Sequence, residues 1–337
     1  MAFRNVTSGA LLGVACIGLA VAGCGSSTSS TSSGGSQPKG TANVAYAASL
    51  QFLNEKVVAP AFHQAQGYTF SGRGGASGEL EAAIAAHEIT PNVFESVGGD
   101  NITPLQPKFT KWYVQYAGTS MVVAYNPKSK YASQFAAIAS GKKPMKDLFL
   151  LMEKPGFKLG RTDPNIDPQG RDFIFMLELA QKFYHLPSNT VTKILGGSPS
   201  SPNSPQIFAE SSLDATLQSG QLDAASAFVT QAIELHLHYI PLPTAINLGD
   251  ASLAAQYAKA SVTITVKGVK TVKHGSPQVI DITMIGKPTA AGTAFVKYTL
   301  SPAGLAQYKQ GGFTLLKPTV FGDSSAIPVA VKSELGG

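Results

Sequence analysis

The sequence repeats one pattern of apolar and polar residues three times. Short apolar runs at 44–47, 68–70 and 158–160 are each followed by a small polar turn and then by apolar residues at helical spacing. A short, bounded apolar run predicts a buried strand, and the helical spacing predicts a helix after it. Alternating strands and helices predict an α/β fold, in which a parallel sheet carries helices on both faces.

Small polar side chains stand where the three predicted helices begin. Ser49 and Asp167 occupy N-cap positions, and Ser77 lies at the entrance of the second helix, after the predicted glycine-rich turn 72–76. Pro168 follows Asp167 and suits the first helical position. Helix N-termini beyond the carboxyl ends of strands can bind a small anion through neutral donors. The alternative is that these side chains only cap their helices.

The N-terminus has the features of a secretory signal. Arg4 precedes an apolar run at 10–21, which is too short for a transmembrane helix, and Ala22-Gly23-Cys24 ends the segment. We therefore expect a signal peptide at 1–23. The residues before Cys24 resemble the bacterial lipobox, in which cleavage is coupled to acylation of the cysteine. An ordinary signal peptide with an incidental cysteine is the alternative.

The segment 24–40 is rich in Ser, Thr and Gly, a composition typical of a flexible tether. A lipid on Cys24 and this tether would hold the protein at a membrane. We expect it to be extracytoplasmic, in a periplasm or on the outer face of the cytoplasmic membrane.

Charge and cysteine content narrow the possible functions. Only 14% of the residues are charged, and 26 basic and 20 acidic side chains give a net charge of +6 that is spread along the chain. A nucleic-acid-binding protein normally concentrates its basic residues in a patch, so we expect no nucleic-acid partner. Cys16 and Cys24 are the only cysteines, which excludes a later disulfide, thiolate zinc site or thiol nucleophile.

Five segments resemble one family in order and spacing. The longest, 111–131, is similar to the first hinge region of the tungstate/molybdate-binding proteins of ABC importers. The others are 48–50, 162–170, 239–248 and 295–304. The resemblance extends over about 45–320.

This resemblance implies a two-lobe periplasmic binding protein fold of the cluster type (type II), with the ligand between the lobes. The chain would leave lobe one near Met121–Tyr125 and return near Val279–Met284, which gives two hinge crossovers. Lobe one would then comprise 41–122 and 279–337, and lobe two 123–278. Hinge closure around a ligand suits this design.

The resemblance also assigns candidate ligands of an oxyanion. Ser49 and Ser77 would bind it from lobe one, and the turn that begins at Asp167 would bind it from lobe two. The backbone N–H groups of Gln169 and Gly170 would be donors. Hydrogen bonds to a charged group contribute about 1.5–3 kcal/mol each, so a few neutral donors can bind a dianion.

The sequence departs from the family pattern at one position. Some members have a glutamate at the position of Ala227, and with an aspartate at the position of Asp167 it completes six-fold coordination of the metal. Ala227 has no carboxylate, which predicts a tetrahedral oxyanion held by hydrogen bonds. Ser226 or Thr230 would be further donors, and Asp167 would turn outward to orient the loop, because a carboxylate repels a dianion.

The sequence thus predicts the lipid-anchored substrate-binding component of an ABC importer rather than an enzyme. Its ligand would be molybdate or tungstate, without a cofactor or a bare metal cation, and its partners the permease and ATPase subunits. We expect a monomer. Sulfate, phosphate or another small oxyanion is an alternative ligand. A lipid-anchored hydrolase is an alternative of another class, but the sequence shows no nucleophile–base pair or metal cluster.

Overall fold

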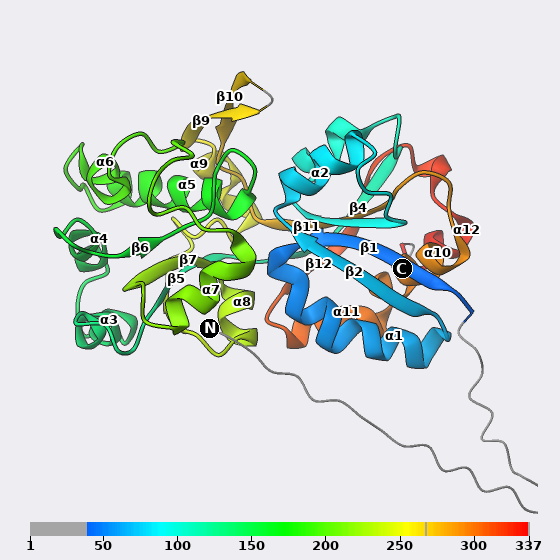
Figure 1. Cartoon of the computed structure of the whole chain (residues 1–337), viewed down its shortest axis with the longest axis horizontal. Coiled ribbons are helices and arrows are strands. Elements are labelled where there is room, and N and C mark those ends of the chain that lie inside the picture. The colour runs from blue at the N-terminus through cyan, green and yellow to red at the C-terminus, as the bar shows by residue number, and fades with distance from the viewer. Residues whose placement is uncertain (1–38, 267, 336–337) are drawn as a thin grey trace, which may run out of the picture. The chain divides into compact units, whose positions relative to one another are not determined.

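The computed structural model describes residues 39–335 except residue 267. The predicted signal peptide, Cys24 and the tether as far as residue 38 lie outside the described residues. The described chain forms two larger β-sheets, each with its own helices, and a separate two-stranded hairpin; we call the two parts built on the larger sheets lobe one and lobe two (Figure 1). None of the helices in this part of the chain has the length and apolar character that crossing a membrane requires.

Lobe one is built on a six-stranded sheet with the strand order β12-β4-β11-β3-β1-β2. Its strands are β1 (Thr41–Ala47), β2 (Thr69–Gly75), β3 (Val93–Val97), β4 (Trp112–Gly118), β11 (Val279–Met284) and β12 (Thr314–Gly322). Strand β1 is parallel to β2 and β3, as predicted. The prediction of a wholly parallel sheet is wrong, because β11 and β12 run antiparallel to their neighbours.

Helices cover both faces of this sheet. They are α1 (Ala59–Gln66), α2 (Ser77–Ala85), α10 (Ala290–Leu300), α11 (Pro302–Gln310) and α12 (Val329–Lys332), with short turns η1 (Ala48–Leu50), η2 (Leu53–Val58), η3 (Gly99–Asn101), η4 (Thr103–Leu105) and η6 (Ser324–Ala326). Successive side chains of β1 point to opposite faces of the sheet, and both faces are apolar. Val44 and Tyr46 join the main hydrophobic cluster, whereas Ala45 packs in a separate cluster with Leu80 of α2.

Lobe two contains a four-stranded sheet with the order β6-β7-β5-β8 and a separate two-stranded hairpin. The strands are β5 (Met121–Tyr125), β6 (Leu159–Gly160), β7 (Ala224–Phe228) and β8 (His238–Pro241), and the hairpin is β9 (Ser261–Val266) and β10 (Val269–His274). The helices are α3 (Ala132–Ala139), α4 (Lys146–Met152), α5 (Pro168–Phe183), α6 (Thr190–Leu195), α7 (Glu210–Gln218), α8 (Val229–Glu234) and α9 (Ala254–Tyr257), with the turn η5 (Ala251–Leu253).

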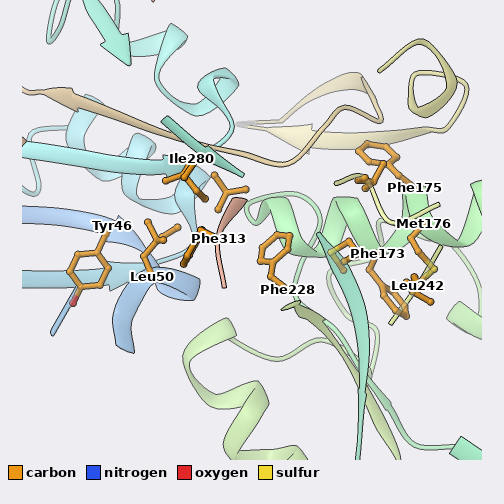
Figure 2. Packing of buried hydrophobic residues seen from close by; sticks show 14 of the residues in the cluster. Tyr46, Leu50, Phe173, Phe175, Met176, Phe228, Leu242, Ile280 and Phe313 are labelled. Carbon is orange, nitrogen blue, oxygen red and sulfur yellow. The ribbon is translucent and has the colours of Figure 1, made fainter. Parts of the chain in front are cut away.

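Two crossovers connect the lobes and lie side by side. The first joins β4 to β5, and the second joins β10 to β11. The N–H of Thr119 in the first donates to the carbonyl of Gln278 in the second at 3.1 Å. The main hydrophobic cluster continues from one lobe to the other, and Figure 2 shows Phe313 and Phe228 among its members.

Local signals predicted some helix starts correctly and others incorrectly. Asp167 is the N-cap of α5, with Pro168 at the first helical position, as predicted. Ser49 is not an N-cap: it lies inside η1, whose N-cap is Ala47. The expected turn at 72–76 is also wrong, because β2 continues to Gly75 through pairing with β1.

Candidate functional site

Ser49 and Ser77 lie near the carboxyl ends of β1 and β2, where each strand passes into a helical turn. Both side chains are buried. The Ser77 hydroxyl accepts a hydrogen bond from the N–H of Val97 at 3.3 Å. The Ser49 hydroxyl makes no hydrogen bond of ordinary geometry among the described residues. The Ser49 hydroxyl and N–H lie instead close to Glu210 of lobe two and act against the burial that raises the pKa of its carboxyl group.

The two lobes meet directly beside Ser77. The N–H of the next residue, Gly78, donates to the carbonyl of Ile166 in lobe two at 2.9 Å. A Cβ atom on Gly78 would lie 2.5 Å from that carbonyl oxygen, so only glycine fits this contact. Ile166 immediately precedes Asp167, and the contact thus brings the start of α2 against the start of α5.

Asp167 is buried at the N-terminus of α5, with only 2% of its surface exposed. Its Oδ1 accepts a hydrogen bond from the N–H of Gln169 at 2.8 Å, so the carboxylate orders the turn. The prediction that Asp167 orients the loop is thus confirmed, whereas its predicted outward direction is wrong because the side chain is buried. Burial raises the pKa of Asp167 to about 6, against the opposing effects of the Gln169 N–H, Arg171 and Thr162, so Asp167 takes up a proton more easily than an exposed carboxylate does.

The turn that follows Asp167 fits tightly against the preceding loop. A Cβ atom on Gly170 would lie 2.4 Å from the carbonyl oxygen of Thr162, so this position has no room for a side chain. Gly170 is one of the first residues of α5, whose N–H groups have no acceptor inside the helix. The N–H of Gln169, by contrast, already donates to Asp167.

A buried hydrogen-bond network surrounds the side chain of Gln169. Its Nε2 donates to Gln231 Oε1 at 2.7 Å, and its Oε1 accepts from the hydroxyl of Ser226 at 2.9 Å. The hydroxyl of Thr230 lies 3.2 Å from that of Thr119. Ser226 thus contacts Gln169, whereas Thr230 contacts Thr119 of the first crossover, and protein groups already occupy both hydroxyls.

Glu210, the first residue of α7, also belongs to the site but is not among the residues predicted from the sequence. Its Oε1 accepts from Gln231 Nε2 at 3.1 Å and from Gln169 Nε2 at 3.4 Å. Burial raises the pKa of Glu210 well above its usual range, and the negative charge of Asp167 raises it further. The hydroxyl and N–H of Ser49 act in the opposite direction as hydrogen-bond donors. Glu210 thus contacts lobe one as well as the lobe-two network.

Two cavities border this group of residues. One, of about 450 Å³, is lined by Arg73, Asp167 and Glu210, among others. The second, of about 310 Å³, includes Ser49, Glu210 and Glu234 in its lining. Both combine residues of the two lobes, and Glu210 borders both. Among the described residues, no three His, Cys, Asp or Glu side chains gather as a candidate metal site.

One buried cation stands close to the site in the sequence. Arg161 follows β6 and immediately precedes the loop 162–167, and its side chain is fully buried. Burial lowers the pKa of Arg161 to about 10, so the guanidinium stays charged at neutral pH. Lobe two thus carries a permanent positive charge in the segment that leads to Asp167.

The geometry defines a class of protein: two α/β lobes joined by two crossovers, with buried polar groups from both lobes facing each other. This is the type II periplasmic binding protein fold. The periplasmic molybdate-binding protein of Azotobacter vinelandii shares it, with a TM-score of 0.53 and 16% identity over 81% of this chain and 98% of that one. Peb3 from Campylobacter jejuni gives a TM-score of 0.51 at 9% identity, over 81% of this chain and 98% of that one.

Residues 42–314 match the model of the bacterial extracellular solute-binding proteins, and the chain belongs to that family. It is a family of transport proteins and not of enzymes. The chain is 29% identical to the molybdate/tungstate-binding protein WtpA of Pyrococcus abyssi, over 67% of this chain and 68% of that one.

Two further relatives match shorter segments. A putative ABC transporter molybdenum-binding protein of Haloferax volcanii is 34% identical over 48% of this chain. An uncharacterized solute-binding protein of Petrotoga mobilis is 29% identical over 63% of this chain. The chain spans half the length of the first of these two and 64% of the second.

Proposed function

We propose that this solute-binding protein captures molybdate or tungstate in the cleft between its lobes and delivers it to the permease and ATPase subunits of an ABC importer. The observation that carries this proposal is the meeting of Ser49 of lobe one with Asp167 and Glu210 of lobe two between two cavities. In this proposal the hydroxyl of Ser77 and the N–H of Gly170 are further donors, whereas the N–H of Gln169 already donates to Asp167. The names of the molybdenum-binding relatives point to the same ligands.

The two buried carboxylates favour these ligands over sulfate. Ala227 cannot supply the second carboxylate that the family pattern suggests, but Glu210 supplies one from α7. In the family pattern two carboxylates complete six-fold coordination of the metal, and carboxylate oxygens are the ligands that hard metal ions prefer; sulfate contains no metal centre. A site with two carboxylates therefore offers molybdate or tungstate contacts that sulfate cannot use. Phosphate and sulfate remain the alternative ligands.

Calorimetric titration of the purified protein tests this proposal. We expect micromolar or tighter binding of molybdate and tungstate, which corresponds to about 8 kcal/mol or more, and at least about tenfold weaker binding of sulfate and phosphate. Ser49→Ala should weaken molybdate binding by about 1–3 kcal/mol through loss of a donor. Ser140→Ala, at an exposed position in lobe two, is the matched control. Equal affinity for all four anions would contradict the proposal.

We further propose that the protein is held outside the cytoplasm by a lipid on Cys24, as a monomer on the segment 24–40. The support is the sequence pattern around Cys24. Cys24→Ala should move the protein from the membrane fraction to the soluble fraction and abolish labelling by radioactive palmitate. Labelling that persists in the variant would refute acylation at this cysteine.

A further inference from the structure

A cluster of charged side chains joins the lobes at a second point, outside the candidate anion site. Asp100 of η3, in lobe one, lies 2.7 Å from the ammonium of Lys273 on β10 and 3.8 Å from the guanidinium of Arg171 on α5. Both cations belong to lobe two. One carboxylate therefore bridges two cations across the boundary between the lobes.

Lobe one holds Asp100 in place for this contact. The side-chain amide of Asn101 donates to Asp100 Oδ1 at 3.2 Å and to the carbonyl of Val97 at 2.9 Å. It fixes one carboxylate oxygen, and the other, Oδ2, faces Lys273 and Arg171. Asp100 therefore has its own support in lobe one, independent of the cations.

The lobe-two side of the cluster is connected to the candidate anion site. Arg171 lies one helical turn after Asp167, and its N–H donates to the carbonyl of Asp167 at 3.3 Å. Its side chain is only 7% exposed. A cavity of about 420 Å³ separates the lobes here, with Asp100, Arg171 and Lys273 in its lining. The first turn of α5 thus faces both the anion site and the charged cluster.

We propose that Asp100 is a positioning residue for anion binding: it holds the lobes closed by bridging Arg171 and Lys273, and it stabilises the bound state without touching the anion. The contact joins the lobes and breaks when they separate, so its free energy favours the closed state alone. Asp100 is itself a negative charge. Removing this charge should strengthen anion binding electrostatically but should weaken it by disfavouring the closed state, so the two effects on affinity have opposite signs.

Asp100→Asn tests the proposal, which rests on the proposed oxyanion binding. Partly exposed ion pairs contribute little each, so we expect the dissociation constant for molybdate to rise only about fivefold, or about 1 kcal/mol. The increase should come from faster dissociation, measured by stopped flow, with an unchanged or faster association rate. Lys270→Met, at an exposed position on the same strand as Lys273, is the matched control.

Two further measurements separate the possible outcomes. Lys273→Met and the double variant Asp100→Asn/Lys273→Met should show non-additive losses, because both substitutions break one bridge. Tighter binding by Asp100→Asn, or strictly additive losses, would overturn the proposal.

Small-angle X-ray scattering tests closure without any ligand. Asp100→Asn should give a larger radius of gyration than the wild type and the Lys270→Met control, and an unchanged radius would overturn the proposal. If the wild type binds no oxyanion, the proposed function fails, while the scattering result still decides whether Asp100 holds the lobes closed.

Discussion

Replacing Asp167 by asparagine distinguishes two effects of its buried carboxylate: the destabilisation of the folded protein and the contribution to ligand binding. The Asp167 side chain caps α5 through the N–H of Gln169 and is almost fully buried. Asparagine is as good an N-cap as aspartate and has nearly the same shape. Asp167→Asn should therefore keep the helix start and remove only the titratable charge.

The magnitude follows from the pKa of Asp167. Burial raises that pKa from 3.8 to about 6, and each unit corresponds to about 1.4 kcal/mol, so ionisation in the folded state costs about 3 kcal/mol. Between these pH values the folded protein keeps a proton that the unfolded chain has lost. Wild-type stability therefore falls as the pH rises through this window. At pH 8 the variant should gain about 3 kcal/mol over the wild type, and at pH 3.5 almost nothing.

Urea unfolding across this pH range measures the gain in the free energy of unfolding. In thermal unfolding the same gain should raise the melting temperature by roughly 5 °C at pH 8. Molybdate affinity, measured on the same samples, should fall about tenfold or more if the carboxylate binds the ligand. The stability and the affinity then move in opposite directions.

Asp250→Asn is the matched control. Asp250 also caps a helical turn, η5, through the N–H of Ser252, but it is only partly covered, and its hydrogen bonds lower its pKa. It should show no gain at high pH. An Asp167→Asn variant that is less stable than the wild type at pH 8, or equally stabilised at pH 3.5 and pH 8, would refute the electrostatic reasoning.

Three other substitutions test the surroundings of the site. Gly78→Ala should weaken molybdate binding about tenfold or more, measured by calorimetry, because its Cβ would meet the carbonyl of Ile166 only when the lobes are closed; an unchanged melting temperature without ligand is the control. Gly170→Ala should lower the melting temperature itself, because its Cβ would lie 2.4 Å from the carbonyl of Thr162 within lobe two. Glu234→Gln should flatten the decline of the melting temperature between pH 4.5 and pH 8, because burial raises the pKa of Glu234 to about 8 and wild-type stability falls as the pH rises through this range.

Local chemistry explains which parts of the fold could be predicted. The strand at 44–47 and the helix after Asp167 were recognisable because a short apolar run and an Asp-Pro start are signals within a few residues. The antiparallel direction of β11 could not be recognised from the sequence, because it depends on how the chain returns from lobe two. Ser49 was misassigned as an N-cap because the first turn after β1 starts two residues earlier, at Ala47.

The site was less predictable than the fold because its groups meet only in the tertiary structure. Glu210 starts an ordinary amphipathic helix, and nothing near it in the sequence indicates that it faces Ser49 or accepts a hydrogen bond from Gln169. The orientation of Asp167 was misjudged for a related reason. The repulsion between a carboxylate and an anion follows from the residue type, but the burial that raises the pKa of Asp167 is not visible in the sequence.

The first turn of α5 has a consequence for any attempt to change the ligand. Gln169 faces the buried network around Glu210, and Arg171, on the same turn, faces Asp100 of the other lobe. A substitution that shifts this turn to fit an anion of another size also shifts the cross-lobe ion pair. Ligand preference and the open–closed equilibrium are therefore coupled variables in this protein. Engineered selectivity should carry a change in residence time, even where the new anion fits the site equally well.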